Sequence, residues 1–240
     1  AEEFGCDVPE DAYEQMAGAI EDEADWEAIR EEPWFRSAQV TADEQDFFHW
    51  ELEFPEVFFD AEGEKMGEAG FDAVVGNPPY IKTQNLRSKH PEFTEYLIGT
   101  LRFTTTEGRF DIYAPFVEQG AHLSANSNLS YILPNKFFTR KHGEPLREYL
   151  SENDLVREIL DFGQNQVFSG VTTYTSILSL EANRSEFDYL RAKHLPSTSE
   201  DIREFERVNI DLDALGTDPW VLTGPQEMRV LRRMEKVGYT

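Results

Sequence analysis

The sequence is poor in cysteine, in lysine and in long apolar runs. Its one cysteine, Cys6, excludes a disulfide framework and any zinc site that is built on several cysteines. No apolar run approaches the roughly 18 residues that span a membrane, and no signal peptide is recognisable. We therefore expect a cytoplasmic protein without a membrane partner.

Basic residues are also scarce: the 240 residues include 22 Lys and Arg against 47 Asp and Glu, which gives a net charge of −25. Taken alone, this charge disfavours nucleic acid as a partner, because phosphate binding shows as a basic surface. It is also typical of salt-adapted proteins, in which a high net charge keeps the chain soluble. The 18 phenylalanines and a hydrophobic fraction of 40% exclude a disordered acidic chain.

The acidic residues are unevenly distributed along the chain. Residues 1–76 carry 3 basic and 24 acidic side chains, whereas residues 77–147 carry 9 basic and 6 acidic ones. Residues 148–240 are acidic again, with 10 basic and 17 acidic side chains. The middle zone alone is net positive, so the charge of the whole chain does not decide whether this zone contacts nucleic acid.

Hydrophobic periodicity and turn residues predict an α/β domain. We expect surface helices within residues 9–32, an extended segment or strand at 47–59 and a buried strand at 71–75. Further along, a helix, a strand, a helix and two strands are predicted at residues 110–124, 129–133, 143–151, 155–162 and 175–180. This alternation favours a layered domain with a largely parallel sheet.

Three regions follow from these patterns. An acidic helical region covers residues 1–46, and the catalytic part covers residues 47–182. After residue 182 the pattern weakens into polar sequence, so residues 183–240 are interpreted as a linker and the start of a second domain.

The segment Asn77-Pro78-Pro79-Tyr80 carries the clearest chemical signal. It follows a predicted strand, and open α/β sheets bind ligands beyond the carboxyl ends of their strands. The Asn77 amide oxygen and the Pro78 carbonyl are two acceptors that suit the two N–H groups of an exocyclic amine. Tyr80 offers an aromatic face to a planar base. A plain strand-ending turn is the alternative interpretation, and it fits the full string FDAVVGNPPYI less well.

This string resembles motif IV of the gamma-type N6-adenine DNA methyltransferases, which include type IIG restriction–modification enzymes and phage-exclusion methylases. Other segments are similar to family signatures and come in the family's order. They are FHWELEFPEVF before the motif, and after it Phe110–Glu118, Leu129–Phe138 with its PNKF sequence, Leu146–Leu150, and Ile159–Leu180.

The resemblance implies a fold, a reaction and site residues. The fold would be the C-terminal part of a Rossmann-like methyltransferase sheet, and the methyl donor would be S-adenosylmethionine, used by direct displacement without a metal. Asn77 and the Pro78 carbonyl would bind the N6 amino group of an adenine extruded from double-stranded DNA. Tyr80 would stack on one face of that base, and Phe168 would contact the other.

The sequence departs from the family in its cofactor half. Family members carry a Gly-rich loop and an acidic ribose contact before motif IV, but this sequence contains no G-x-G. We therefore expect a piece of a longer polypeptide, trimmed at both ends, that binds S-adenosylmethionine weakly by itself. Its cofactor-binding residues are not identifiable from this sequence.

Basic residues surround the PNKF sequence and are candidates for DNA phosphate contacts. They are Lys136, Arg140, Lys141 and Arg147. Scattered surface charge is the alternative for any one of them, and their concentration beside the proposed base site favours phosphate binding.

Two alternative functions stay open at the level of sequence. NPPY also occurs in enzymes that methylate a protein glutamine or an amine of an RNA base. A non-catalytic module that binds DNA or a partner is the other alternative, because the cofactor half is missing. Restriction or defence-system subunits are possible partners, while no cluster of residues supports a nuclease activity in this chain.

Overall fold

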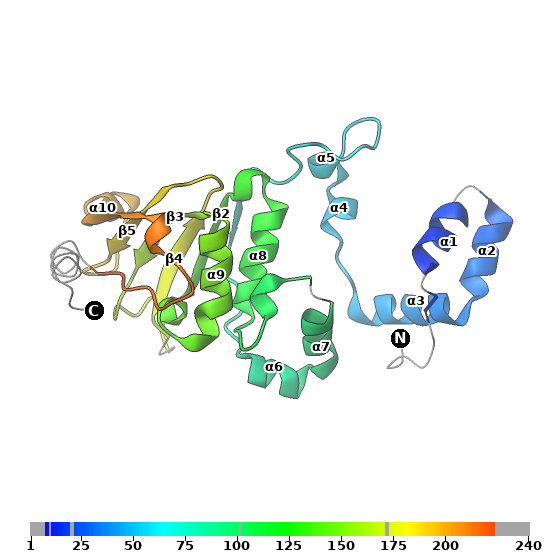
Figure 1. Ribbon diagram of the computed structural model, residues 1–240, viewed down its shortest axis with the longest axis horizontal. Coiled ribbons are helices and arrows are strands. Elements are labelled where there is room, and N and C mark those ends of the chain that lie inside the picture. The colour runs from blue at the N-terminus through cyan, green and yellow to red at the C-terminus, as the bar shows by residue number, and fades with distance from the viewer. Residues whose placement is uncertain (1–7, 10, 20–21, 101, 171–172, 224–240) are drawn as a thin grey trace. The chain divides into compact units, whose positions relative to one another are not determined.

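The computed structural model divides the chain into two compact units, Ala1–Glu56 and Val57–Thr240 (Figure 1). The residues that it describes are 8–9, 11–19, 22–100, 102–170 and 173–223. Within these residues, no helix is long and apolar enough to cross a membrane.

The first unit is helical. Its helices are α1 (Ala12–Ala19), α2 (Glu23–Glu31), α3 (Pro33–Gln45) and α4 (Trp50–Glu53). Asp22 caps α2, since its carboxylate accepts a hydrogen bond from the Ala24 N–H at 2.8 Å. A small core forms around Ile29 and Trp34, and the acidic residues lie on the outer faces. The surface helices predicted within residues 9–32 are thus confirmed as α1 and α2.

The extended segment predicted at residues 47–59 is wrong. These residues form α4 and the short helix α5 (Pro55–Phe58), which begins at a proline. Proline is tolerated in the first turn of a helix, because its missing N–H has no intrahelical partner there. Phe47, Phe48 and Trp50 are exposed, and the rings of Phe48, Trp50 and Phe54 contact one another, so the density of aromatic residues does not mark a strand.

The second unit is built on one sheet of six strands, in the order β1-β2-β4-β3-β5-β6. The strands are β1 (Val74–Gly76), β2 (Leu129–Pro134), β3 (Val156–Asp161), β4 (Thr175–Leu180), β5 (Glu186–Arg191) and β6 (Arg207–Asp211). The other helices are α6 (Thr83–Lys89), α7 (Pro91–Gly99), α8 (Tyr113–Leu123), α9 (Glu144–Glu152) and α10 (Ser199–Arg203). This is an α/β fold, as the sequence predicts.

The sheet is mixed and not largely parallel. β1 pairs with β2 in parallel and β3 pairs with β5 in parallel, whereas β4 is antiparallel to both of its neighbours and β6 to β5. The reversal of β4 follows from its connection, because the chain leaves β3, turns and returns between β2 and β3. Consequently β1, β2, β3 and β5 all run in one direction.

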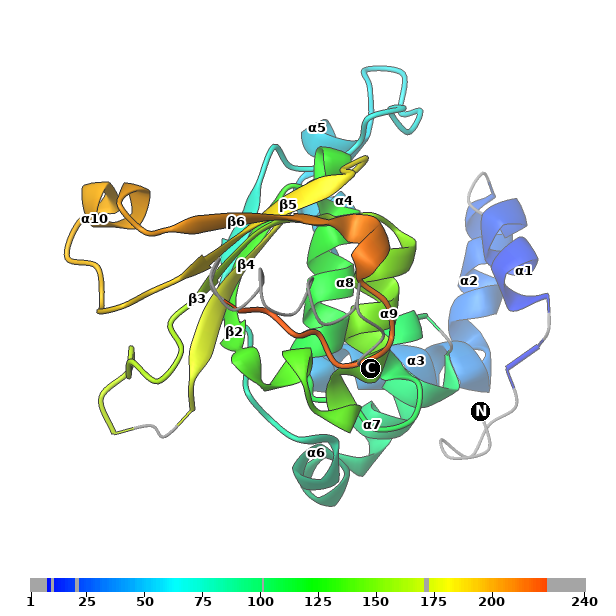
Figure 2. The same ribbon diagram turned by 60° about the vertical axis from the view of Figure 1, so that its left-hand side comes forward.

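Helices α8 and α9 lie on one face of this sheet (Figure 2). The main core fills the space between them and includes Val117 of α8, Leu150 of α9 and Leu178 of β4, all fully buried. Gly120 lets α8 approach the sheet, since a Cβ there would lie 2.4 Å from a methyl group of Leu129. A smaller cluster around Leu160 and Phe205 covers part of the opposite face.

The strand predicted at residues 71–75 is shorter than expected and is not buried throughout. Strand β1 starts only at Val74 and is the edge strand of the described sheet. Val74 faces the main core, and Val75 points the other way with 80% of its surface exposed. No described element of the second unit covers Val75, so this part of the sheet surface is open.

The chain continues the same sheet beyond residue 182. The sequence pattern predicts no strands there, yet β5 and β6 pair along five residues. Their charged residues alternate with buried ones such as Phe187 and Tyr189, and this short alternation is easily taken for polar loop. The domain limits at residues 46 and 182, and the start of a second domain within residues 183–240, stay a prediction, and residues 224–240 lie outside the described residues.

Candidate active site

Three loops meet at one edge of the sheet, because β1, β2 and β3 run in the same direction, with the antiparallel β4 between β2 and β3. β1 leads into Asn77–Tyr80, β2 into the PNKF sequence, and β3 into the loop that contains Phe168. The strand β4 begins at this edge with Thr175, which pairs with Pro134. The carboxyl ends of parallel strands are where sheets of this kind bind ligands.

The NPPY segment is fixed on the sheet by its tyrosine. The Tyr80 hydroxyl donates a hydrogen bond to the Ile132 carbonyl of β2 at 2.9 Å, and burial raises the pKa of Tyr80. The phenol is therefore neutral, as the donated hydrogen bond requires. Pro78 is buried, while the side chains of Asn77 and Pro79 are exposed. The structure thus leaves Asn77 accessible and holds the tyrosine ring half-buried beside β2.

The chain after NPPY is attached to the start of α8. The Ile112 N–H donates to the Ile81 carbonyl at 2.9 Å, and Lys82 forms a β-bridge with Asp111. The Asp111 carboxylate also lies 3.5 Å from the His142 ring. Burial raises the pKa of Asp111, and the positive charges nearby oppose this rise. The segment Phe110–Glu118 therefore supports the loop that carries NPPY.

Asp161, at the end of β3, organises this edge of the sheet. Its carboxylate is 8% exposed and accepts hydrogen bonds from the Asn135 side-chain amide at 2.9 Å and from the Gly163 N–H at 2.9 Å. The Tyr189 hydroxyl of β5 donates to its second oxygen at 3.0 Å. Sequence reasoning missed Asp161, although an acidic residue directly after a buried strand was a usable signal.

Phe168 lies half-buried in the loop between β3 and β4, on the same edge as NPPY. Among the described residues, no ring contact joins Phe168 and Tyr80. Thr172, part of the Thr-rich segment quoted for the resemblance, lies outside the described residues.

The basic residues around PNKF are divided by the structure. Lys136, Arg140 and Lys141 are exposed on the loop between β2 and α9. Arg147, which the sequence grouped with them, is 2% exposed and binds only backbone carbonyls, so its assignment to a phosphate contact is wrong. A residue on the first turn of α9 faces inward where the helix packs on the loop, and the charge pattern alone did not reveal this.

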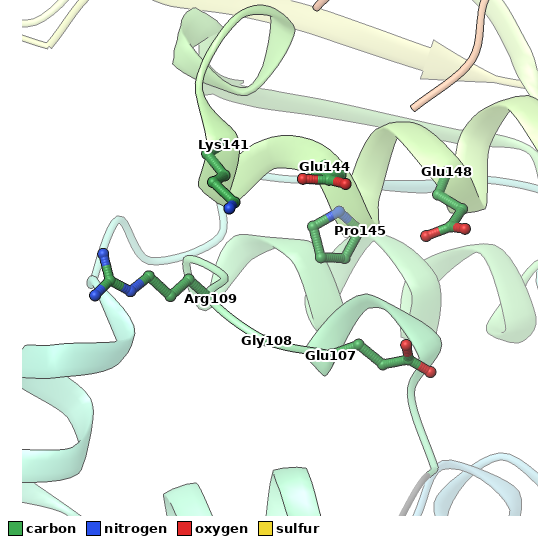
Figure 3. A pocket seen from close by; sticks show the side chains of 7 residues that line it. All are labelled: Glu107, Gly108, Arg109, Lys141, Glu144, Pro145 and Glu148. Atoms are coloured by element: carbon green, nitrogen blue, oxygen red, sulfur yellow. The ribbon is translucent and has the colours of Figure 1, made fainter. Parts of the chain in front are cut away.

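An open groove of about 630 Å³ adjoins this loop and adds Arg109 to the basic residues. Figure 3 shows Arg109 and Lys141 at one end of the groove, with Glu107 and Glu148 toward the other. Sequence reasoning did not single out Arg109, because it lies far from PNKF along the chain. Positive charge therefore gathers at one end, and acidic side chains line the other.

The sheet beside NPPY is open at its outer edge among the described residues. The outer edge of β1, beside NPPY, has no partner strand among them, and Val75 next to this edge is exposed. The sequence also has no G-x-G turn that could approach a cofactor there.

Replacing Asp161 with alanine should lower the free energy of unfolding by about 1–3 kcal/mol, because the Asn135 amide and the Tyr189 hydroxyl lose their acceptor. Asp188→Ala is the matched control. It removes a surface ion pair with Arg207 in the same sheet, worth at most about 1 kcal/mol. Urea unfolding measures the free energy of unfolding of both variants. An equal loss in both would show that the hydrogen bonds of Asp161 contribute no more to stability than the surface ion pair of Asp188.

Comparison with known proteins agrees with the motifs. The model of the Eco57I restriction-modification methylase family matches residues 10–168, more than half of the chain. The type II restriction enzyme and methyltransferase RM.Eco57I of Escherichia coli is 34% identical over 156 residues, which are 63% of this chain and 15% of that protein. The type II methyltransferase M.PaeR7I of Pseudomonas aeruginosa is 31% identical over 188 residues, 70% of this chain and 31% of the relative.

A solved structure is similar as well. The methyltransferase subunit of a type I restriction-modification system from Streptococcus thermophilus has 16% sequence identity and a TM-score of 0.45, covering 64% of this chain and 37% of that one. The chain spans less than a third of the length of the two curated relatives. On the match to the family model, the chain belongs to the Eco57I restriction-modification methylase family.

Proposed function

We propose that this chain is the base-binding part of a site-specific DNA methyltransferase that modifies N6 of adenine in a restriction–modification or phage-defence system. The observation that carries the proposal is the meeting of NPPY, PNKF and the Phe168 loop at one edge of the sheet. Membership of a family of restriction-modification methylases supports it. The partner is double-stranded DNA in the cytoplasm, and the possible protein partners are other subunits of such a system.

The exposed Asn77 side chain and the Pro78 carbonyl would hold the exocyclic amine of an extruded adenine. Accepting both N–H groups draws the nitrogen lone pair out of conjugation with the ring, so that the nitrogen becomes a better nucleophile. Tyr80, anchored through its hydroxyl, would stack on the base, and such stacking is worth roughly 1–3 kcal/mol. Phe168 would close the other side. S-adenosylmethionine, which the family implies, supplies the methyl group when it is bound.

Asn77→Ala should lower the rate of methyl transfer by at least about 100-fold, because one of two acceptors for the reacting amine is lost. Asn85→Ala, an exposed asparagine on α6, is the control and should keep the activity. The assay incubates the full-length protein with duplex DNA and S-adenosylmethionine and identifies the product by nucleoside mass spectrometry. N6-methyladenine is expected. Methylated cytosine in the DNA, or methyl transfer only to an RNA or protein substrate offered in a parallel reaction, would contradict the proposal. The absence of any product would favour the non-catalytic alternative.

Lys136, Arg140 and Lys141 would contact DNA phosphates, with Arg109 beside them. Changing the first three to methionine should weaken DNA binding and lower the slope of log Kd against log salt by about 2–3, because each phosphate contact releases about 0.9 counterion. Arg157→Met with Arg184→Met is the control. These exposed arginines lie toward the opposite ends of the strands. An unchanged salt slope in the triple variant would remove this assignment.

The acidic residues are proposed to be an adaptation to high salt that leaves the DNA-facing zone basic. Residues 1–76 hold 24 of the 47 acidic side chains, and residues 77–147 only 6. The full-length protein should therefore be more soluble and more active in molar KCl than at low salt. Equal solubility and activity in both, measured by light scattering and the methylation assay, would contradict the adaptation.

A further inference from the structure

Arg147 is the largest side chain that the second unit buries completely, with 2% of its surface exposed. A buried charge is costly unless it is fully compensated. Among the described residues, no carboxylate lies within ion-pair distance of its guanidinium. Burial accordingly lowers the pKa of Arg147, and the charges of Glu144 and Asp218 oppose this. Interactions other than an ion pair must therefore compensate for the burial of the Arg147 charge.

The guanidinium is surrounded by backbone carbonyls from two segments far apart in the sequence. One nitrogen, Nη1, donates to the carbonyls of Phe137 at 2.6 Å and Arg140 at 2.9 Å. The other two donate to Thr217, at 2.6 and 2.9 Å, and Nε also reaches Asp218 at 3.0 Å. The planar fork of arginine suits this arrangement, because it presents several donors in fixed directions.

The segment that Arg147 binds also packs on the PNKF loop by itself. The Trp220 N–H donates to the Phe138 carbonyl at 2.7 Å, and the indole, 4% exposed, stacks on the Phe138 ring at 6.4 Å. Gly143 permits the close turn on the other side, since a Cβ there would lie 2.3 Å from the Phe137 oxygen. The loop is thus enclosed between α9 and residues 216–220.

Lys136 and Arg140 belong to this loop. Lys136 lies between Asn135, which Asp161 holds, and Phe137, whose carbonyl Arg147 holds. The carbonyl of Arg140 itself accepts from Arg147. The backbone that carries both exposed cations is therefore fixed by two buried charges, one from the end of β3 and one from α9.

We propose that Arg147 is a positioning residue that fastens residues 216–220 to the loop 135–140 and so sets the direction in which Lys136 and Arg140 meet DNA. The DNA part of this inference rests on the proposed function, whereas the fastening of the two segments does not. The segment after β6 is then part of the DNA-facing site and not a passive linker.

The test is hydrogen–deuterium exchange of the full-length protein as wild type, Arg147→Met, Arg147→Lys and the exposed control Arg157→Met. In Arg147→Met, amides in residues 135–143 and 216–220 should exchange at least about tenfold faster, while those of β2, β3 and β4 stay within about twofold. Arg147→Lys should be intermediate, because one ammonium group cannot reach all four carbonyls. If Arg147→Met does not fold, the Arg147→Lys variant alone provides the test.

Two results would overturn the inference. Faster exchange across the whole sheet in Arg147→Lys would mean that the residue only stabilises the fold, and unchanged exchange in both segments would mean that it does not fasten them. A second measurement on Arg147→Lys, the affinity for duplex DNA by anisotropy, should drop roughly three- to tenfold with a smaller salt slope. If the wild type itself does not bind DNA, the proposed function fails, and the exchange pattern still decides the role of Arg147.

Discussion

The common direction of β1, β2 and β3 is the constraint on which the proposed site depends. Each strand ends at the same edge of the sheet, and the loops that follow carry NPPY, PNKF and Phe168. Strand β4 lies between β2 and β3 and runs antiparallel to both, so β1, β2 and β3 keep their common direction. The placement of the three loops at one edge is therefore a consequence of topology, and the Tyr80–Ile132 hydrogen bond joins the NPPY segment to strand β2.

Two buried charges make this edge rigid. Asp161 collects donors from the PNKF loop, its own loop and β5, and Arg147 collects carbonyls from the PNKF loop and the segment after β6. Within the described part of the chain, each charged group is buried without an ion-pair partner, and hydrogen bonds to several protein groups compensate for its burial. The exposed cations on the same loop then start from a defined backbone. The cations near PNKF therefore have two roles: Arg147 is buried and structural, whereas Lys136 and Arg140 are exposed and can contact a polyanion.

Sequence predicts the parts of this arrangement that depend on local pattern. The strands at 129–134 and 175–180 and the helix at 144–152 agree with prediction, because turn residues and proline mark their limits. The short strands β5 and β6 were not predicted, since their pairing within the sheet decides them. The helical form of residues 50–58 was missed because a high density of aromatic residues is typical of strands. Asp161 and Arg147 were missed or misassigned because the partners that tie them to other segments, Asn135, Tyr189, Thr217 and Asp218, lie 26 to 71 residues away.

The central claim is that this edge receives a single base taken out of the duplex. Fluorescence of 2-aminopurine, placed at the methylated position of a duplex bound to the full-length protein, measures this most directly. Intensity should rise several-fold above that of the free duplex, and it should rise further in Tyr80→Ala, where stacking no longer quenches the base. Intensity that stays at the level of the free duplex, under conditions in which the protein binds and methylates DNA, would contradict the account.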